Sequence, residues 1–89
     1  MLSKEVTIVN KLGLHARAAA KFVTTATAFA ADIKLKRGDK QVNGKSIMGV
    51  MMLAASKGTT LELIADGADE AEAIAQIETL IADRFGEGE

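Results

Sequence analysis

The chain has 89 residues, of which 48% are hydrophobic and 26% charged, and it contains no cysteine. This length fits one compact domain over residues 1–89, whose hydrophobic core must hold the fold without disulfides or a thiolate metal site. The 11 basic and 12 acidic side chains leave a net charge of −1, and the three aromatic residues are all Phe. These numbers exclude a general nucleic-acid surface, which needs excess basic charge and stacking aromatics.

The composition is that of a folded globular domain rather than a disordered tail. No apolar run is long enough to span a bilayer, and Lys4 and Glu5 interrupt the apolar start of the chain. The sequence therefore predicts no signal peptide and no membrane insertion, and the cytoplasm is the expected location.

Hydrophobic periodicity predicts seven elements in the order strand, helix, strand, strand, helix, strand, helix. The β-branched run at 6–9 is apolar on both faces and favours a central strand. After residue 15, apolar side chains recur at helical spacing and indicate an amphipathic helix of about a dozen residues. Its stripe comprises Ala19, Phe22, Val23, Ala26 and Ala30. Further strands are predicted at 32–37, 40–43 and 59–65, and further helices at 47–55 and 70–84.

The predicted helices have recognisable boundary residues. Ser46 is a suitable N-cap for the helix at 47–55, and Gly58 is available for a left-handed C-terminal cap. Asp69, with Glu72 three residues later, resembles a capping box for the last helix, whose final turn contains Arg84. Together the elements predict an α+β fold. It is an open-faced two-layer sandwich in which a four-stranded antiparallel sheet carries three helices on one face.

His15 is the only histidine, and it stands where the loop after the first strand becomes the first helix. The backbone N–H groups of Ala16, Arg17 and Ala18 belong to the first helical turn, which has unpartnered donors and attracts anions. Arg17 adds a guanidinium fork suited to phosphate oxygens. Histidine is also a nucleophile that forms phospho-intermediates. The plainer interpretation is an N-cap or a packed loop residue.

Two stretches carry a family resemblance: Gly-Leu-His-Ala-Arg at 13–17 and Lys-Ser-Ile-Met-Gly-Val-Met-Met-Leu at 45–53. With the length and the element order, they resemble the HPr family, the histidine-containing phosphocarrier proteins of the phosphoenolpyruvate-dependent sugar phosphotransferase system. The resemblance implies a carrier rather than an enzyme. His15 would accept a phosphoryl group on Nδ1 from Enzyme I and pass it to IIA proteins or domains. Arg17 and the backbone amides of Ala16, Arg17 and Ala18 would hold the phosphate, without a cofactor or metal.

Position 18 departs from the family pattern, in which proline often follows the arginine. Here the residue is Ala18, and the chain contains no proline at all. Alanine lacks the rigidity of proline but restores one N–H donor at the helix start. We expect function to survive the change, with the transfer rate and the stiffness of the loop affected.

The resemblance also implies a regulatory phosphorylation site at Ser46, serving carbon catabolite regulation where an HPr kinase/phosphorylase is present. A phosphate there would place about two negative charges beside the docking face. The helix after Ser46 is apolar nearly all round, so part of it should face outward and suit several partners in turn. The docking candidates are Ile47, Met48, Met51, Ala20 and Lys21. Steering charge would come from Lys21, Lys45 and Arg17.

Other hypotheses remain open at this point. The carrier of the nitrogen-related phosphotransfer branch shares the histidine but feeds a regulatory IIA protein. A domain of this size could instead be a ligand-sensing or protein-interaction module without covalent chemistry. RNA binding is opposed by charge and aromatic content, and an independent enzyme by the lack of a pocket and of a second catalytic group. A shuttle between partners is expected to be a monomer.

Overall fold

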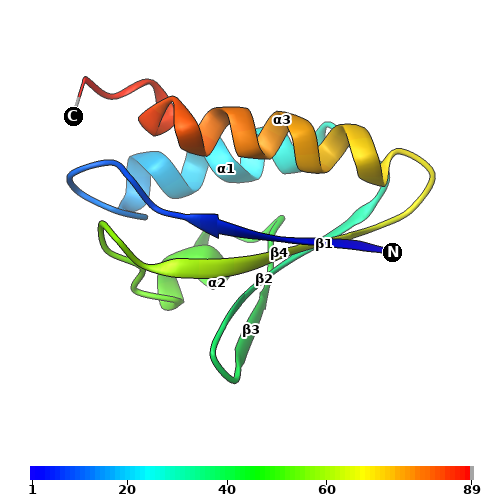
Figure 1. The fold of residues 1–89 in the computed structure, drawn as a ribbon, viewed down its shortest axis with the longest axis horizontal. Helices are drawn as coiled ribbons and strands as arrows, with labels where there is room; N and C mark the ends of the chain where they lie inside the picture. The colour runs from blue at the N-terminus through cyan, green and yellow to red at the C-terminus, as the bar shows by residue number, and fades with distance from the viewer. Residues whose placement is uncertain (89) are drawn as a thin grey trace.

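A computed structural model describes residues 1–88; Glu89 lies outside the described part. Within that range the chain forms four strands in one antiparallel sheet of order β1-β4-β2-β3, together with three α-helices and a short 3-10 helix (Figure 1). The strands are β1 (Leu2–Thr7), β2 (Asp32–Arg37), β3 (Lys40–Asn43) and β4 (Thr60–Asp66). The helices are α1 (Ala16–Thr27), α2 (Ile47–Met52), α3 (Glu70–Ala82) and η1 (Arg84–Gly86).

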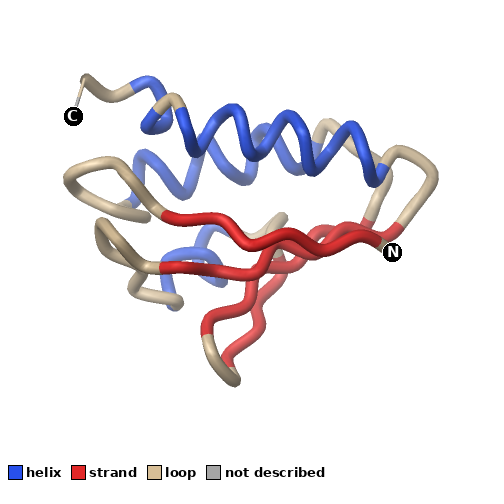
Figure 2. Tube along the Cα trace, viewed as in Figure 1, coloured by secondary structure: helices blue, strands red, loops and turns tan. Residues whose placement is uncertain are grey.

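The long helices α1 and α3 form a layer over one side of the sheet (Figures 1 and 2). The shorter α2 packs against α1 and β3. This arrangement confirms the predicted α+β class and the open four-stranded sheet with three helices. The strands alternate as the sequence indicated. Ile33 and Leu35 of β2 and Leu61 and Leu63 of β4 are buried, and they meet Phe22 of α1 in one hydrophobic core.

The first strand differs from its prediction. β1 spans Leu2–Thr7 and pairs only with β4, so it is an edge strand; the prediction of a central strand at 6–9 was wrong. Within β1 only Val6 is buried. The apolar run continues past the strand to Ile8, which is fully buried. The N–H of Ile8 donates to Thr59 O, and its carbonyl accepts from Gly58 N–H, just before β4. Burial alternates along the run, with Val6 and Ile8 buried and Thr7 between them exposed, as in a strand that is covered on one face.

The second helix ends earlier than predicted, at Met52 rather than residue 55. Gly58 does not cap it: Gly58 lies in the turn before β4, and the left-handed residue that follows α2 is Ala54, with φ of 51°. Basic side chains of the β2–β3 hairpin satisfy the last carbonyls of the helix instead. Arg37 Nη1 donates to Leu53 O at 2.8 Å, and Lys40 Nζ donates to Met52 O at 2.7 Å. Such cations stabilise a helix C-terminus without a glycine.

The start of α3 also differs from its prediction. Asp69 is the N-cap residue but makes no side-chain bond to the helix, so the capping box with Glu72 was wrong. The Asp69 carboxylate accepts instead from the backbone N–H groups of Ala30 and Ala31, each at 2.8 Å. These bonds, led by that of Ala30, hold the pKa of Asp69 below its ordinary value. The side chain thus joins the start of α3 to the connection between α1 and β2.

Both long helices end before the predicted residues. α1 stops at Thr27, so Ala30 lies beyond it and is exposed instead of belonging to the buried stripe. α3 stops at Ala82, and Arg84 falls in η1 rather than in the last turn of the helix. Arg84 and Phe85 both take left-handed φ angles, 56° and 55°, which turn the chain away from the α3 axis. The residues after this turn lie at the end of the molecule where α1 begins (Figure 1), and Glu87 contacts Asn10 and His15 there.

Candidate functional site

The loop at residues 10–15, called the histidine loop below, is held firmly against the chain before β4. Leu14 is buried and its N–H donates to Ala55 O at 2.8 Å. Gly13 has φ of +68°, and a Cβ on it would lie 2.4 Å from Ala55 O. Only glycine fits so close a backbone approach in this conformation. The histidine loop therefore delivers His15 to the start of α1 in one orientation.

His15 is the N-cap residue of α1, as the plainer interpretation held. Its backbone is extended, its carbonyl accepts from Ala19 N–H at 2.8 Å, and its Nδ1 accepts from Arg17 N–H at 3.3 Å. The side chain is 29% exposed. Capping and chemistry are compatible here, because the same geometry turns the Nδ1 lone pair toward the donors of the first helical turn.

The opposite ring nitrogen contacts a residue that sequence reasoning missed. Nε2 of His15 lies 2.5 Å from Oε2 of Glu87, which is 72 positions away in the sequence. A carboxylate only accepts, and Nδ1 already accepts from Arg17 N–H, so the proton of the neutral ring belongs on Nε2. Both neighbours of the ring therefore favour one tautomer, with the lone pair on Nδ1.

Asn10 holds Glu87 in place. This side chain is fully buried, and its Nδ2 donates to Oε1 of Glu87 at 2.9 Å and to Gly13 O at 2.8 Å. The bond from Asn10, followed by that from His15, holds the pKa of the Glu87 carboxyl below its ordinary value of 4.5. One asparagine thus fixes both the histidine loop and the carboxylate that faces the imidazole.

Acid is expected to release this carboxylate. Because the folded-state pKa of Glu87 is depressed, its ionised form stabilises the fold fully above about pH 4.5 and loses this effect as pH falls through the lower folded value. Amide hydrogen exchange at residues 85–88, compared between about pH 6 and pH 3 after correction for the intrinsic exchange rates, should show the C-terminal residues opening in acid. The Glu87→Gln variant, which has no carboxyl group to titrate at this position, should lack this pH dependence. Equal protection of the wild type at the two pH values would contradict the assignment.

Basic side chains surround an open hollow beside the histidine. The hollow has a volume of about 490 Å³ and is lined by Lys11, Leu12, Arg17, Lys21, Gly86, Glu87 and Gly88. Arg17 is exposed, so its guanidinium is accessible to an anion at the helix start. Lys21 Nζ donates to Phe85 O at 2.6 Å, so this lysine also secures the chain after α3. The sequence analysis indicated Arg17 and Lys21 but neither Lys11 nor the hollow, because the C-terminal residues Gly86, Glu87 and Gly88 form part of its lining.

Position 18 is fully buried, and α1 begins at Ala16 without the aid of proline. The first turn therefore has its helical geometry with alanine at this position. The effect of Ala18 on transfer rate and loop stiffness stays a prediction.

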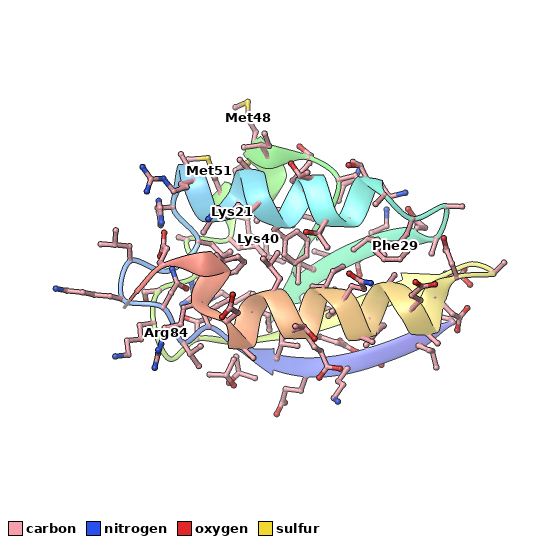
Figure 3. The ribbon with its side chains drawn as sticks, turned by 90° about the horizontal axis from the view of Figure 1, so that it is seen from above. Lys21, Phe29, Lys40, Met48, Met51 and Arg84 are labelled. Carbon is pink, nitrogen blue, oxygen red and sulfur yellow. The ribbon has the colours of Figure 1, made fainter. Side chains whose placement is uncertain are left out.

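Ser46 is the N-cap of α2, since its Oγ accepts from Gly49 N–H at 3.1 Å. As predicted, α2 exposes several apolar side chains to solvent. Met48 is 75% exposed, and Ile47, Met51 and Met52 are exposed as well. Figure 3 shows Met48 and Met51 projecting from the α2 side of the molecule, beside the first half of α1, where Lys21 is found. Of the other two docking candidates, Ala20 is half-buried and Lys21 is exposed. Lys45, which was predicted to supply steering charge, donates to Phe29 O at 2.8 Å.

These features define a class: a small open-faced α+β sandwich that presents one histidine nitrogen at a basic helix N-terminus. Comparisons with known proteins agree. The family model described as "PTS HPr component phosphorylation site" matches residues 2–83. Phosphocarrier protein HPr of Neisseria meningitidis is 57% identical over 89 residues, covering 100% of both chains. The solved HPr-C-His of Thermoanaerobacter tengcongensis covers 100% of both chains with a TM-score of 0.96 and 47% identity.

A further solved structure, an HPr dimer from Thermoanaerobacter tengcongensis, has a TM-score of 0.78 and 51% identity, and the match covers 94% of this chain and 99% of that one. The chain belongs to the HPr family of phosphocarrier proteins of the phosphotransferase system. Among residues 1–88, no helix combines the length and apolar character that crossing a membrane requires.

Proposed function

We propose that this protein carries a phosphoryl group on Nδ1 of His15, which it takes from phospho-Enzyme I and passes to IIA proteins of the sugar phosphotransferase system. It acts as a monomeric single domain in the cytoplasm, without a cofactor or metal. The observation that carries the proposal is the orientation of His15. Its Nδ1 faces the first turn of α1 and its Nε2 faces Glu87. This orientation leaves a nucleophilic lone pair where an anion is best received.

The transfer itself needs no second acid or base on this chain. The lone pair of Nδ1 forms the new nitrogen–phosphorus bond while the bond between phosphorus and the donor breaks, and the donor keeps that electron pair. The proton of the neutral ring stays on Nε2. Arg17 and the backbone N–H groups of Ala16, Arg17 and Ala18 stabilise the phosphoryl oxygens. Alignment of donor and acceptor is left to the partner protein, as suits a carrier that must release its group again.

Partners dock on the exposed side chains of α2 and the adjoining face of α1. Ile47, Met48 and Met51 supply adaptable apolar contacts. Ala20 and Lys21 lie on α1 beside them, and Arg17 adds positive charge that steers acidic partners. Weak and brief contacts of this kind suit a protein that visits Enzyme I and IIA proteins in turn.

Ser46 is a regulatory phosphorylation site in this proposal, the substrate of an HPr kinase/phosphorylase. Its position as the N-cap of α2 places a phosphate next to Ile47 and Met48, the first docking side chains. The added negative charge would repel acidic partners while leaving His15 chemically unchanged. Phosphorylation would therefore slow exchange with Enzyme I without altering the acceptor.

Ser46→Ala should lower the free energy of unfolding by about 1 kcal/mol, because Gly49 N–H loses its cap. Phosphoryl acceptance at His15 should persist in this variant. Urea denaturation measures the first effect, and Ser3→Ala on the exposed start of β1 provides the matched control, for which we expect no loss of comparable size. A Ser46→Ala variant as stable as wild type would show that the cap contributes nothing.

The proposed function is tested by intact-mass measurement after incubation with phosphoenolpyruvate and Enzyme I. We expect one added phosphoryl group that is lost on mild acid treatment, as a phosphohistidine is. Enzyme I must be active on a known carrier in the same experiment. An unmodified protein under those conditions would overturn the proposal and favour an interaction module without covalent chemistry.

A further inference from the structure

The C-terminal residues 84–88, called the tail below, are held beside the histidine by a series of contacts. Phe85 is fully buried in the hydrophobic core and anchors the tail immediately after α3. Lys21 Nζ binds the carbonyl of Phe85 at 2.6 Å, which fastens the tail to α1. Gly86, with φ of 75°, then turns the chain so that Glu87 faces the histidine loop. Figure 3 shows Lys21 on the helix that lies beside the end of α3, with Arg84 at the turn.

We propose that Glu87 is a positioning residue for phosphoryl transfer at His15, acting through Nε2 of the imidazole and held by Asn10. This inference rests on the proposed function, because it assigns a role in the same reaction. Glu87 contacts Nε2 and not Nδ1, where the phosphoryl group binds. It therefore acts on the phosphoryl acceptor only through the imidazole ring.

The first effect of Glu87 is on the orientation of the ring. An exposed histidine side chain rotates and exchanges tautomers, and only one arrangement presents an unprotonated Nδ1 to the donor. The 2.5 Å contact with Glu87 keeps the proton on Nε2 and stops rotation of the ring. The bond from Arg17 N–H to Nδ1 is longer, at 3.3 Å, and therefore holds the ring less strongly.

The second effect is on charge. When Nδ1 gives its lone pair to phosphorus and Nε2 keeps its proton, the ring becomes positively charged. The carboxylate of Glu87 then faces a developing cation, and a hydrogen bond between charged groups is stronger than one to a neutral ring. The interaction grows along the reaction, so it lowers the barrier more than it stabilises the resting state.

Asn10 makes this arrangement rigid. Its Nδ2 binds both Glu87 Oε1 and the carbonyl of Gly13, and the side chain is fully buried. Each oxygen of the carboxylate therefore has its own donor, one from the asparagine and one from the imidazole. The carboxylate cannot turn away from the ring without giving up its bond to the buried Asn10 amide.

The test compares Glu87→Gln with wild type and with Glu72→Gln. In wild type the bonds from Asn10 and His15 go to different oxygens of Glu87. In glutamine one of these oxygens is replaced by an NH2 group, which donates and cannot accept, so one of the two bonds is lost. Glu72 is exposed on the first turn of α3, at the opposite end of that helix, and its replacement changes the net charge equally (Figure 1). The rate of phosphorylation by phospho-Enzyme I should fall about tenfold in Glu87→Gln, equivalent to about 1.4 kcal/mol of barrier. It should stay within about twofold of wild type in Glu72→Gln.

A spectroscopic readout separates positioning from a structural role. In ¹⁵N-labelled wild type, at a pH where the imidazole is neutral, the Nε2 proton should exchange slowly and resonate far downfield, and Nδ1 should show the shift of an unprotonated nitrogen. Glu87→Gln should lose the slow, downfield proton and show averaged tautomers. Urea denaturation of both variants establishes that each is folded.

An unchanged rate in Glu87→Gln would overturn the positioning role, as would an unchanged imidazole spectrum. These results are distinct from failure of the proposed function, in which wild type itself takes up no phosphoryl group. If the wild type is phosphorylated and Glu87→Gln is slowed with an altered imidazole spectrum, both the function and the role of Glu87 are supported.

Discussion

Replacing His15 by alanine or by asparagine is expected to lower phosphoryl acceptance by more than about a thousandfold, because each change removes the nucleophile. The reaction has no substitute, since the chain contains one histidine and no cysteine. Single-turnover phosphorylation by phospho-Enzyme I, followed by intact mass, measures the loss.

The two His15 variants differ in what they do to the fold. Asparagine is a good N-cap and keeps an acceptor for Arg17 N–H, whereas alanine has none and should lower the free energy of unfolding by about 1 kcal/mol. Loss of acceptance in both, with near-wild-type stability in His15→Asn, would assign the effect to chemistry. Phosphorylation of a folded His15→Asn variant at a substantial rate would place the acceptor elsewhere.

Phe85→Ala is expected to lower the free energy of unfolding by about 3–5 kcal/mol, the cost of emptying a large core position. Phe85 is 0% exposed although it lies outside the α-helices, and it belongs to the hydrophobic core where η1 packs against α1 and α3. Urea denaturation monitored by circular dichroism measures the loss. The same variant should slow phosphorylation at His15, because the tail that carries Glu87 loses its anchor.

Phe85→Leu is the matched control for this prediction. Leucine keeps most of the buried volume and should cost less than about 1.5 kcal/mol. It should also keep the tail in place and phosphorylation near the wild-type rate. A loss below about 1 kcal/mol in Phe85→Ala would show that the tail packs on the surface of the fold without contributing to its core.

Local sequence pattern was sufficient to place several of the elements. β2 and β3 have the predicted bounds, α1 begins at the predicted residue, and Ser46 caps α2 as expected. In each, the signal is short-ranged: alternation in a strand, a 3.6-residue stripe in a helix, a hydroxyl before an apolar run.

Contacts between residues far apart in the sequence decided the features that the sequence analysis missed. α2 ends where Arg37 and Lys40 reach its carbonyls, not where a glycine becomes available. The Asp69 side chain makes no cap bond to α3 because the amides of Ala30 and Ala31 compete for its carboxylate from 39 and 38 positions away. No local pattern encodes such partners, since they meet only when the sheet and helices are packed.

In the candidate site, too, some features follow from the local sequence and others only from the tertiary structure. By itself the sequence determined the open α+β fold, the single histidine before a helix, its neighbour Arg17 and the membership of the HPr family, because these depend on residue type and local spacing. Only the tertiary structure decided which imidazole nitrogen faces the helix and which faces a carboxylate. That choice depends on Glu87 and Asn10, which are 77 positions apart and are brought together by the buried ring of Phe85 and the turn that follows it.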